Sequence, residues 1–145
     1  AGTLAEAINR CPIPILAARG NCDSEVDQTV LNIPVQSPYA VGDFSLGRIM
    51  VHHGHDRSIE QLANDALRIE AKLVLTGHTH IPHLYNISGV WMVNAGSPAL
   101  PKGDILLASV GFCDTECISV VALDRGEGIL YQAWHGAILS GPGNL

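Results

Sequence analysis

The sequence of 145 residues predicts an α/β protein in which two β-sheets pack face to face beneath helical cover. Helical periodicity is confined to the first half of the chain, where it alternates with short apolar runs as parallel strands require. Beyond residue 80, short β-type runs are separated by Gly, Asp and Ser, which is typical of a β meander. Since a domain holds about 150 residues, we expect a single domain over residues 1–145.

The first third of the chain predicts a helix, a strand and a hairpin. Apolar residues at helical spacing over 4–8 indicate the end of an amphipathic helix, which Pro12 terminates. Residues 13–18 are apolar and predict a short buried strand that leads into the first polar turn. Residues 40–41 and 48–52 bracket a polar turn, so they predict a hairpin whose second strand ends at a histidine.

The middle of the chain predicts the clearest helix and the most deeply buried strand. Residues 58–61 fit a capping box, and apolar residues then recur at helical spacing up to about residue 71. Residues 73–76 follow as a fully buried strand that ends at Gly77. The β runs expected in the second half are residues 84–86, 90–94, 105–110, 117–123 and 129–134. We expect the polar turns that follow these strands to gather along one rim of the sheets.

Charge and composition limit the class of partner. With a formal net charge of −6 and only eight Lys and Arg, the chain lacks the basic face that nucleic acid or anionic lipid requires. An anionic substrate needs a local attraction instead, which a bound divalent cation supplies. No run approaches the roughly 18 apolar residues of a membrane span, and no secretory leader pattern opens the chain. The four cysteines lack CxxC spacing, so we expect reduced thiols in a cytoplasmic protein.

Three short polar motifs, each directly after a strand-like run, indicate a metal site built from loops. They are Gly-Asn-Cys-Asp at 20–23, His-Gly-His at 53–55 and Gly-His-Thr-His at 77–80. A lone His-x-His is a weak signal, and any single histidine more often has a structural role. The ordered combination favours a metal site, because histidines two positions apart on a turn can project into one concavity.

The amide and carboxylate of the first motif have two interpretations. Asn21 is a weaker ligand than a carboxylate and adds no charge, so it fits a hard oxygen-and-nitrogen site of the kind that Mn²⁺ accepts. Its other interpretation is a turn-forming residue next to Gly20. Asp23 could orient a ligand or cap the same turn.

The sequence resembles a known family in four segments. Residues 20–28, 53–55, 75–80 and 94–97 resemble the small YfcE-like phosphodiesterases of the calcineurin-like metallophosphoesterase superfamily, and the resemblance extends over about 13–134. It implies a four-layer α/β/β/α sandwich and two divalent metal ions, most often Mn²⁺, with Zn²⁺, Ni²⁺ or Fe²⁺ as alternatives. It also implies phosphodiester hydrolysis by in-line attack of a hydroxide that bridges the two metals.

The resemblance also implies roles for individual residues. Asn21, His53 and His78 match ligands of the second metal, and His80 matches a ligand of the first. Cys22 stands where larger relatives place a histidine that assists the leaving group, so a proton must come from elsewhere or the leaving group must be good.

Two further side chains are candidates for contact with phosphate oxygens, namely His55 and Arg19. A solvated Arg19 without such a contact is an equal alternative. Together with Cys22, His55 completes the predicted catalytic pair.

The family's opening motifs, Asp-x-His and Gly-Asp, do not occur before Gly20, so we expect the first βαβ segment of the fold to be absent. These motifs supply the bridging aspartate and two ligands of the first metal, so activity would need an N-terminal complement that provides them. The alternative is a non-catalytic protein-interaction module on the same fold. A structural zinc site of His78, His80 and His83 is a third interpretation. Because the missing segment exposes a sheet edge, we also expect a homo-oligomer.

Overall fold

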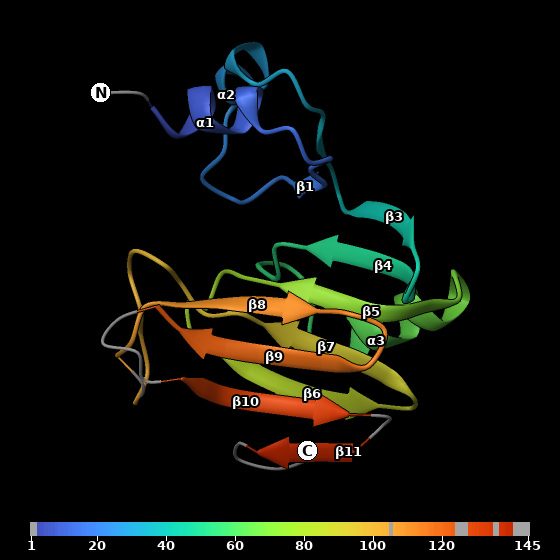
Figure 1. The fold of residues 1–145 in the computed structure, drawn as a ribbon. Coiled ribbons are helices and arrows are strands. Elements are labelled where there is room, and N and C mark those ends of the chain that lie inside the picture. The colour runs from blue at the N-terminus through green and yellow to red at the C-terminus, as the bar shows by residue number, and fades with distance from the viewer. Residues whose placement is uncertain (1–2, 105, 124–127, 135–136, 141–145) are drawn as a thin grey trace.

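The structure is a computed structural model that describes residues 3–104, 106–123, 128–134 and 137–140 (Figure 1). Its helices are α1 (Leu4–Arg10), α2 (Glu25–Val30) and α3 (Ile59–Arg68). Its first strands are β1 (Ala17–Ala18), β2 (Val35–Gln36), β3 (Ala40–Phe44), β4 (Gly47–His52) and β5 (Ala71–Thr76). The remaining strands are β6 (His83–Ile87), β7 (Val90–Asn94), β8 (Ser109–Cys113), β9 (Cys117–Ala122), β10 (Ile129–Trp134) and β11 (Ala137–Ser140).

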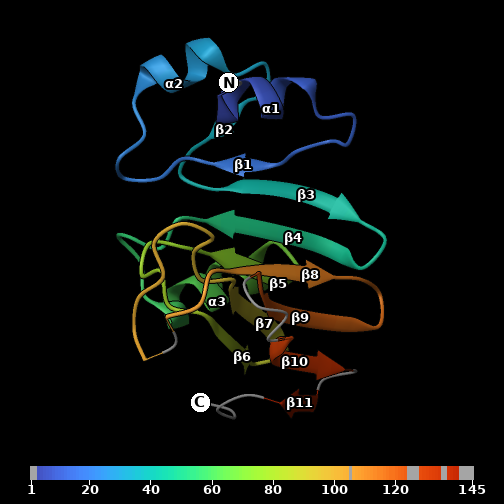
Figure 2. The same cartoon turned by 60° about the vertical axis from the view of Figure 1, so that its left-hand side comes forward.

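Two sheets face each other, and a small third sheet lies beyond their edge (Figure 2). The first sheet has the order β3-β4-β5-β7-β6, in which β4, β5 and β7 run parallel and the two edge strands run antiparallel. The second sheet is the antiparallel meander β11-β10-β9-β8. β1 and β2 form a parallel pair of their own. Parallel neighbours around β5 and an all-β second half are therefore confirmed.

Two apolar clusters hold the layers together on opposite faces of the five-stranded sheet. The cluster beneath α3 contains Met50, Leu62, Ala63, Ala66, Ala71, Val74, Val90 and Met92. The cluster between the two sheets contains Ile49, Leu73, Leu84, Val93 and Val120. Consecutive residues of the central strands are thus buried on alternate faces, which explains why Leu73, Val74 and Leu75 of β5 are all apolar.

The predicted capping box starts α3 as expected. The Ser58 hydroxyl oxygen accepts the Gln61 backbone N–H at 3.2 Å, and the Gln61 side-chain oxygen accepts the Ser58 N–H at 2.9 Å. These bonds satisfy two backbone donors that a helix start otherwise leaves unpaired. The helix then buries Leu62, Ala63 and Ala66 against the sheet.

The parallel register brings the carboxyl ends of three strands to one line. His52 of β4 pairs with Thr76 of β5, and Thr76 pairs with Asn94 of β7. The ladder continues one step further, because the Gly77 N–H donates to the His53 carbonyl oxygen at 3.1 Å. The turns after β4, β5 and β7 therefore lie side by side at one rim, as the sequence predicts.

Several predicted boundaries are wrong for identifiable reasons. The buried strand expected at 13–18 is reduced to Ala17–Ala18, because Pro12 and Pro14 remove backbone donors and Ile13 is 70% exposed. The run expected at 105–110 becomes β8 at Ser109–Cys113, while residue 105 lies outside the described residues. The sequence analysis also missed α2, β2 and β11.

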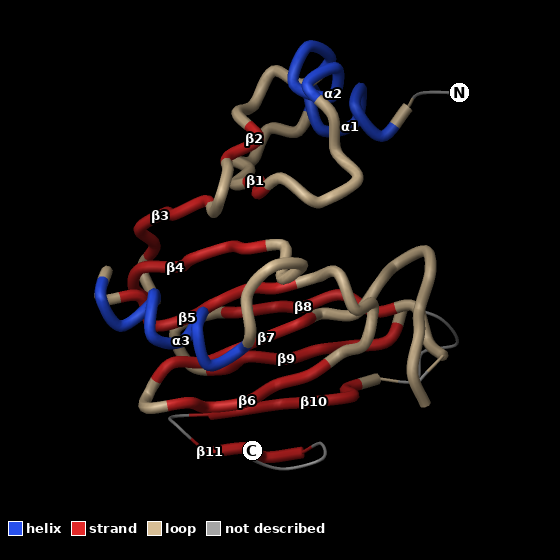
Figure 3. Tube along the Cα trace, turned by 180° about the vertical axis from the view of Figure 1, so that it is seen from behind, coloured by secondary structure: helices blue, strands red, loops and turns tan. Residues whose placement is uncertain are grey.

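The α/β sandwich is confirmed, with α3 covering one face of the five-stranded sheet and the second sheet covering the other. Seen from behind, α1 and α2 lie with β1 and β2 beyond β3, away from the four-stranded sheet (Figure 3). In the described part of the chain, no helix covers the outer face of the four-stranded sheet. A single domain over residues 1–145 stays a prediction.

Gly96 is expected to be intolerant of a side chain. It has φ +81°, and a Cβ there would collide with the Ser109 hydroxyl, whereas Gly89 has φ +85° and open space around it. Both alanine variants carry the strain of a left-handed residue, about 1–2 kcal/mol. We expect Gly96→Ala to lower the free energy of unfolding by at least about 1 kcal/mol more than Gly89→Ala. Equal urea midpoints for the two variants would contradict this prediction.

Candidate functional site

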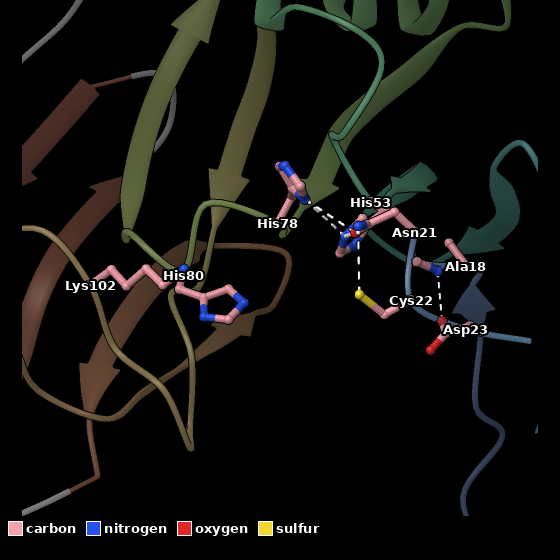
Figure 4. A pocket seen from close by; sticks show the side chains of 9 residues that line it. Ala18, Asn21, Cys22, Asp23, His53, His78, His80 and Lys102 are labelled. Atoms are coloured by element: carbon pink, nitrogen blue, oxygen red, sulfur yellow. Dashed lines mark hydrogen bonds between the residues drawn. The ribbon is translucent and has the colours of Figure 1, made fainter.

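A cleft of about 400 Å³ lies at the rim where the turns meet (Figure 4). Its lining comes from the turn after β1, the turns after β4 and β5, and the loop after β7. The lining residues are Ala18, Gly20, Asn21, Cys22, Asp23, His53, His78, His80 and Lys102. All three sequence motifs therefore contribute to one cavity.

Three potential ligand atoms converge in this cleft from three separate turns. The Asn21 side-chain oxygen lies 2.6 Å from Nε2 of His53 and 3.3 Å from Nδ1 of His78. The two imidazole nitrogens lie 3.2 Å from each other. In the labelled close-up, the three side chains point toward one another (Figure 4). Burial, followed by the neighbouring His78 and His55, lowers the pKa of His53, which favours the neutral imidazole.

The turn that carries His78 and His80 has a strained backbone. Both histidines have positive φ, 63° and 60°, which is uncommon for residues other than glycine. Asn94, which is fully buried, donates from its side-chain nitrogen to the Gly77 carbonyl at 2.8 Å and to the Thr79 hydroxyl at 3.0 Å. Conformations of this kind persist only where surrounding bonds hold them, so Asn94 is a structural support of the site.

His80 is oriented by the loop that follows β7. Its Nδ1–H donates to the Leu100 carbonyl at 2.8 Å, so Nε2 is the nitrogen left to accept or to bind. In return, the Lys102 backbone N–H donates to the His80 carbonyl at 3.1 Å. The loop and the His80 turn thus hold each other in place.

The first motif closes the other side of the cleft. Gly20 packs against His53, since a Cβ at position 20 would lie 3.3 Å from that imidazole. Its backbone N–H donates to the Asp23 carboxylate at 2.6 Å, which is a turn-capping bond. The Cys22 thiol is exposed and accepts from the Asn21 side-chain nitrogen at 3.6 Å.

His55 lies next to His53 and His78 but is not among the residues that line the cleft. Its ring centroid is 5.5 Å from that of His53 and 6.2 Å from that of His78. Asp56 lies between two imidazoles, with carboxylate oxygens 3.3 Å from Nε2 of buried His52 and 3.6 Å from Nε2 of His55. His52 in turn accepts the Gly54 N–H at 2.9 Å, so this cluster braces the His-Gly-His turn.

Arg19 is not among the cleft-lining residues. Its backbone N–H donates to the Gln36 carbonyl at 2.8 Å, which joins β1 to β2. The Ser24 hydrogen bonds and, to a smaller degree, the charge of Arg19 lower the pKa of the Asp27 carboxyl on α2. Contact of Arg19 with a substrate stays a prediction.

The alternative zinc site of His78, His80 and His83 is wrong. His83 lines a separate cavity of about 210 Å³ beneath α3, next to Thr76 and Tyr85, while His78 and His80 line the main cleft. Within the described residues, no three His, Cys, Asp or Glu side chains lie close enough to hold one ion.

Two residues of the site carried no role in the sequence analysis. Asn94 was noted only as part of a family motif, and its position at the end of a buried strand was the available signal. Lys102 lies in a loop without periodicity, so only the tertiary structure places it beside His80.

Comparison with known proteins identifies the family. Residues 1–116 match the profile of the Calcineurin-like phosphoesterase superfamily domain. The chain belongs to this superfamily. Phosphodiesterase YfcE of Escherichia coli K12 is 38% identical to this chain over 121 residues. The aligned region is 83% of this chain and 64% of the E. coli protein. The chain thus spans less than two thirds of the length of the curated relatives it matches.

Solved structures agree with the family assignment. The phosphoesterase Yfce from E. coli matches with a TM-score of 0.73 and 31% identity, covering 90% of this chain and 69% of that one. Wild-type Vps29 of Entamoeba histolytica, complexed with Zn²⁺, has a TM-score of 0.52 and 22% identity, covers 73% of each chain, and shows the shared fold alone. None of the helices that the structure describes in this chain is long and apolar enough to span a bilayer.

His83 is expected to make the protein sensitive to acid. Burial lowers the pKa of His83 from 6.5 to about 4, so the folded protein binds fewer protons than the unfolded chain between these values. Acidification from pH 7 to pH 4 should therefore lower the free energy of unfolding, by up to about 3 kcal/mol from this residue. Urea titrations of metal-free protein test this against His83→Phe, which cannot titrate. The same loss in both proteins would assign the effect to other groups.

Proposed function

We propose that this chain carries the histidine half of a metal-dependent phosphodiesterase site. The observation that carries the proposal is the convergence of Asn21, His53 and His78 in a cleft at the strand ends. The membership in the calcineurin-like phosphoesterase superfamily and the relatives named phosphodiesterase support the reaction class.

The spacing of the three donors suits one divalent ion. With metal–ligand bonds of about 2.0–2.1 Å, neighbouring ligands in tetrahedral or octahedral geometry lie about 2.9–3.4 Å apart. The distances between the three atoms are 2.6, 3.2 and 3.3 Å, so only a small outward movement of Asn21 or His53 is needed. The depressed pKa of His53 adds to this, because the neutral imidazole is the form that binds metal.

The donor set is incomplete for two ions. The three convergent atoms are all uncharged, and the Asp23 carboxylate that lines the cleft is bonded to the Gly20 N–H. Among the described histidines of the lining, His80 alone remains for a second ion, through the nitrogen that Leu100 leaves free. Neutral donors alone do not offset the charge of a pair of dications, so we expect two ions to bind tightly only with carboxylates from a further segment or chain.

The residues of this chain would have separate roles in phosphodiester hydrolysis. Divalent ions, when bound, would supply Lewis-acid stabilisation of phosphate charge and an activated water. Asn21, His53, His78 and His80 would hold them, and the bond from His80 to Leu100 would keep one imidazole in the binding tautomer. Cys22 and His55 would form the catalytic pair, and His55 and Arg19 would contact phosphate oxygens.

Mn²⁺ is the metal we expect, since an amide oxygen with imidazoles forms a hard site, and Zn²⁺, Ni²⁺ and Fe²⁺ are the alternatives. The substrate would be a small phosphodiester, and we expect the protein to act in the cytoplasm. The alternative function, a non-catalytic interaction module, is favoured by the small number of acidic donors, because Asp23 is the single carboxylate among the described lining residues and one of its oxygens already accepts the Gly20 N–H.

Removal of the amide donor is expected to weaken metal binding. Asn21→Ala should raise the Mn²⁺ dissociation constant at least about tenfold, because one of three ligands is lost. Asn64→Ala, an exposed asparagine on α3, is the matched control and should not change it. Calorimetric titration of the 145-residue chain checks both, with metal content after dialysis as a second readout. We expect one ion or none per chain; two retained ions would mean that other residues replace the carboxylates.

The activity is tested on the full-length natural protein loaded with Mn²⁺. We expect hydrolysis of bis(p-nitrophenyl) phosphate that a chelator abolishes and added Mn²⁺ restores. If no phosphodiester is hydrolysed under these conditions, the catalytic proposal fails and the interaction module takes its place.

We further expect this chain to associate with itself. β3 is the terminal strand of the five-stranded sheet, and Phe44 at its end is 48% exposed. Edge strands of this kind pair readily with other chains. Light scattering on the purified chain should therefore give a dimer or larger species, and a single monomeric peak would contradict the prediction.

A further inference from the structure

We propose that Lys102 is the residue that binds the phosphate oxygens of the substrate in this cleft. The assignment rests on the proposed phosphodiesterase function and adds the recognition of the anion to it. The class of ligand is a phosphate ester with one negative charge on its non-bridging oxygens. No family motif identified above contains this lysine.

The first argument is position. Lys102 lines the cleft with Asn21, His53, His78 and His80, and it is the only Lys or Arg among the lining residues that the structure describes. It lies next to His80 in the close-up (Figure 4). Arg19, the cation that the sequence analysis selected for this role, does not line the cleft.

The second argument is that the backbone of Lys102 is held in place. Its N–H donates to the His80 carbonyl at 3.1 Å, and the Leu100 carbonyl accepts from His80 at 2.8 Å. The Ser97 hydroxyl accepts the Leu100 N–H at 2.9 Å, which closes the start of the loop. Gly103 follows with φ +80° and packs against Ile81. Because the loop backbone is held in this way, the Lys102 side chain extends from a fixed position. Less conformational entropy is then lost when its ammonium binds an anion.

The third argument is charge. The chain carries a net charge of −6, so an approaching anion is repelled unless a local cation attracts it. Lys102 forms no ion pair with any residue that the structure describes. Asp23 is the single carboxylate among the described lining residues, and one of its oxygens accepts a backbone N–H on the β1 turn. One ammonium matches the single charge of a phosphodiester, and its three donors can reach more than one oxygen.

The chain offers a matched control for the test, because Lys72 is its only other lysine and lies exposed on β5, outside the cleft. The variants Lys102→Gln, Lys102→Arg and Lys72→Gln are made in the full-length natural protein. The first readout is calorimetric binding of inorganic phosphate, with and without Mn²⁺. We expect Lys102→Gln to weaken phosphate binding about tenfold, Lys102→Arg to retain most of it, and Lys72→Gln to leave it unchanged.

The second readout is kinetic. With bis(p-nitrophenyl) phosphate, Lys102→Gln should raise KM about tenfold and change kcat less than about threefold, because the same contact is made in the bound substrate and in the transition state. If the protein hydrolyses no phosphodiester, the proposed function fails, and phosphate binding still decides the role of Lys102. Phosphate affinity within twofold of the parent in Lys102→Gln, or an equal loss in Lys72→Gln, would overturn the assignment.

Discussion

The parallel alignment of β4, β5 and β7 is the constraint on which the rest of the structure depends. Its register places His52, Thr76 and Asn94 side by side, so the three turns that follow start from one line. Apolar clusters on both faces of the sheet fix this register, because a slip by one residue would exchange the face beneath α3 with the face beneath the second sheet. The proximity of His53 and His78 follows from this register, whereas Asn21 reaches them from the turn after β1, outside the five-stranded sheet.

The site combines a well-packed sheet with turns whose backbone is strained. His78 and His80 have left-handed backbones, and each is held by bonds from elsewhere in the chain, from Asn94 to the turn and from His80 to Leu100. Such support orients imidazoles before any ligand arrives, which reduces the ordering that binding requires. The loop that fixes His80 also carries Lys102, so metal ligand and phosphate contact would be positioned by the same set of bonds.

Elements with a strong local signal were predictable. The capping box at Ser58, the apolar run of β5 and the turn of the β3–β4 hairpin each depend on residues close in sequence. Prediction failed in one segment because prolines outweighed its apolar composition, and in another because residues far along the chain decide. Apolar composition at 13–18 indicated a strand, yet prolines leave only Ala17–Ala18 paired. The start of β8 depends on Ser109, which bonds to the carbonyls of Ala95 and Ser97.

The sequence by itself determined the family, the α/β class and the polar turns that meet at the site. These features depend on short motifs and on apolar periodicity, which involve residues close together in the sequence. Only the tertiary structure decided which side chains share a cavity. It separated His83 from His78 and His80, placed Arg19 outside the cleft lining, and brought Lys102 beside His80. Those relations depend on strand register and on loop hydrogen bonds between distant residues, which no short stretch of sequence encodes.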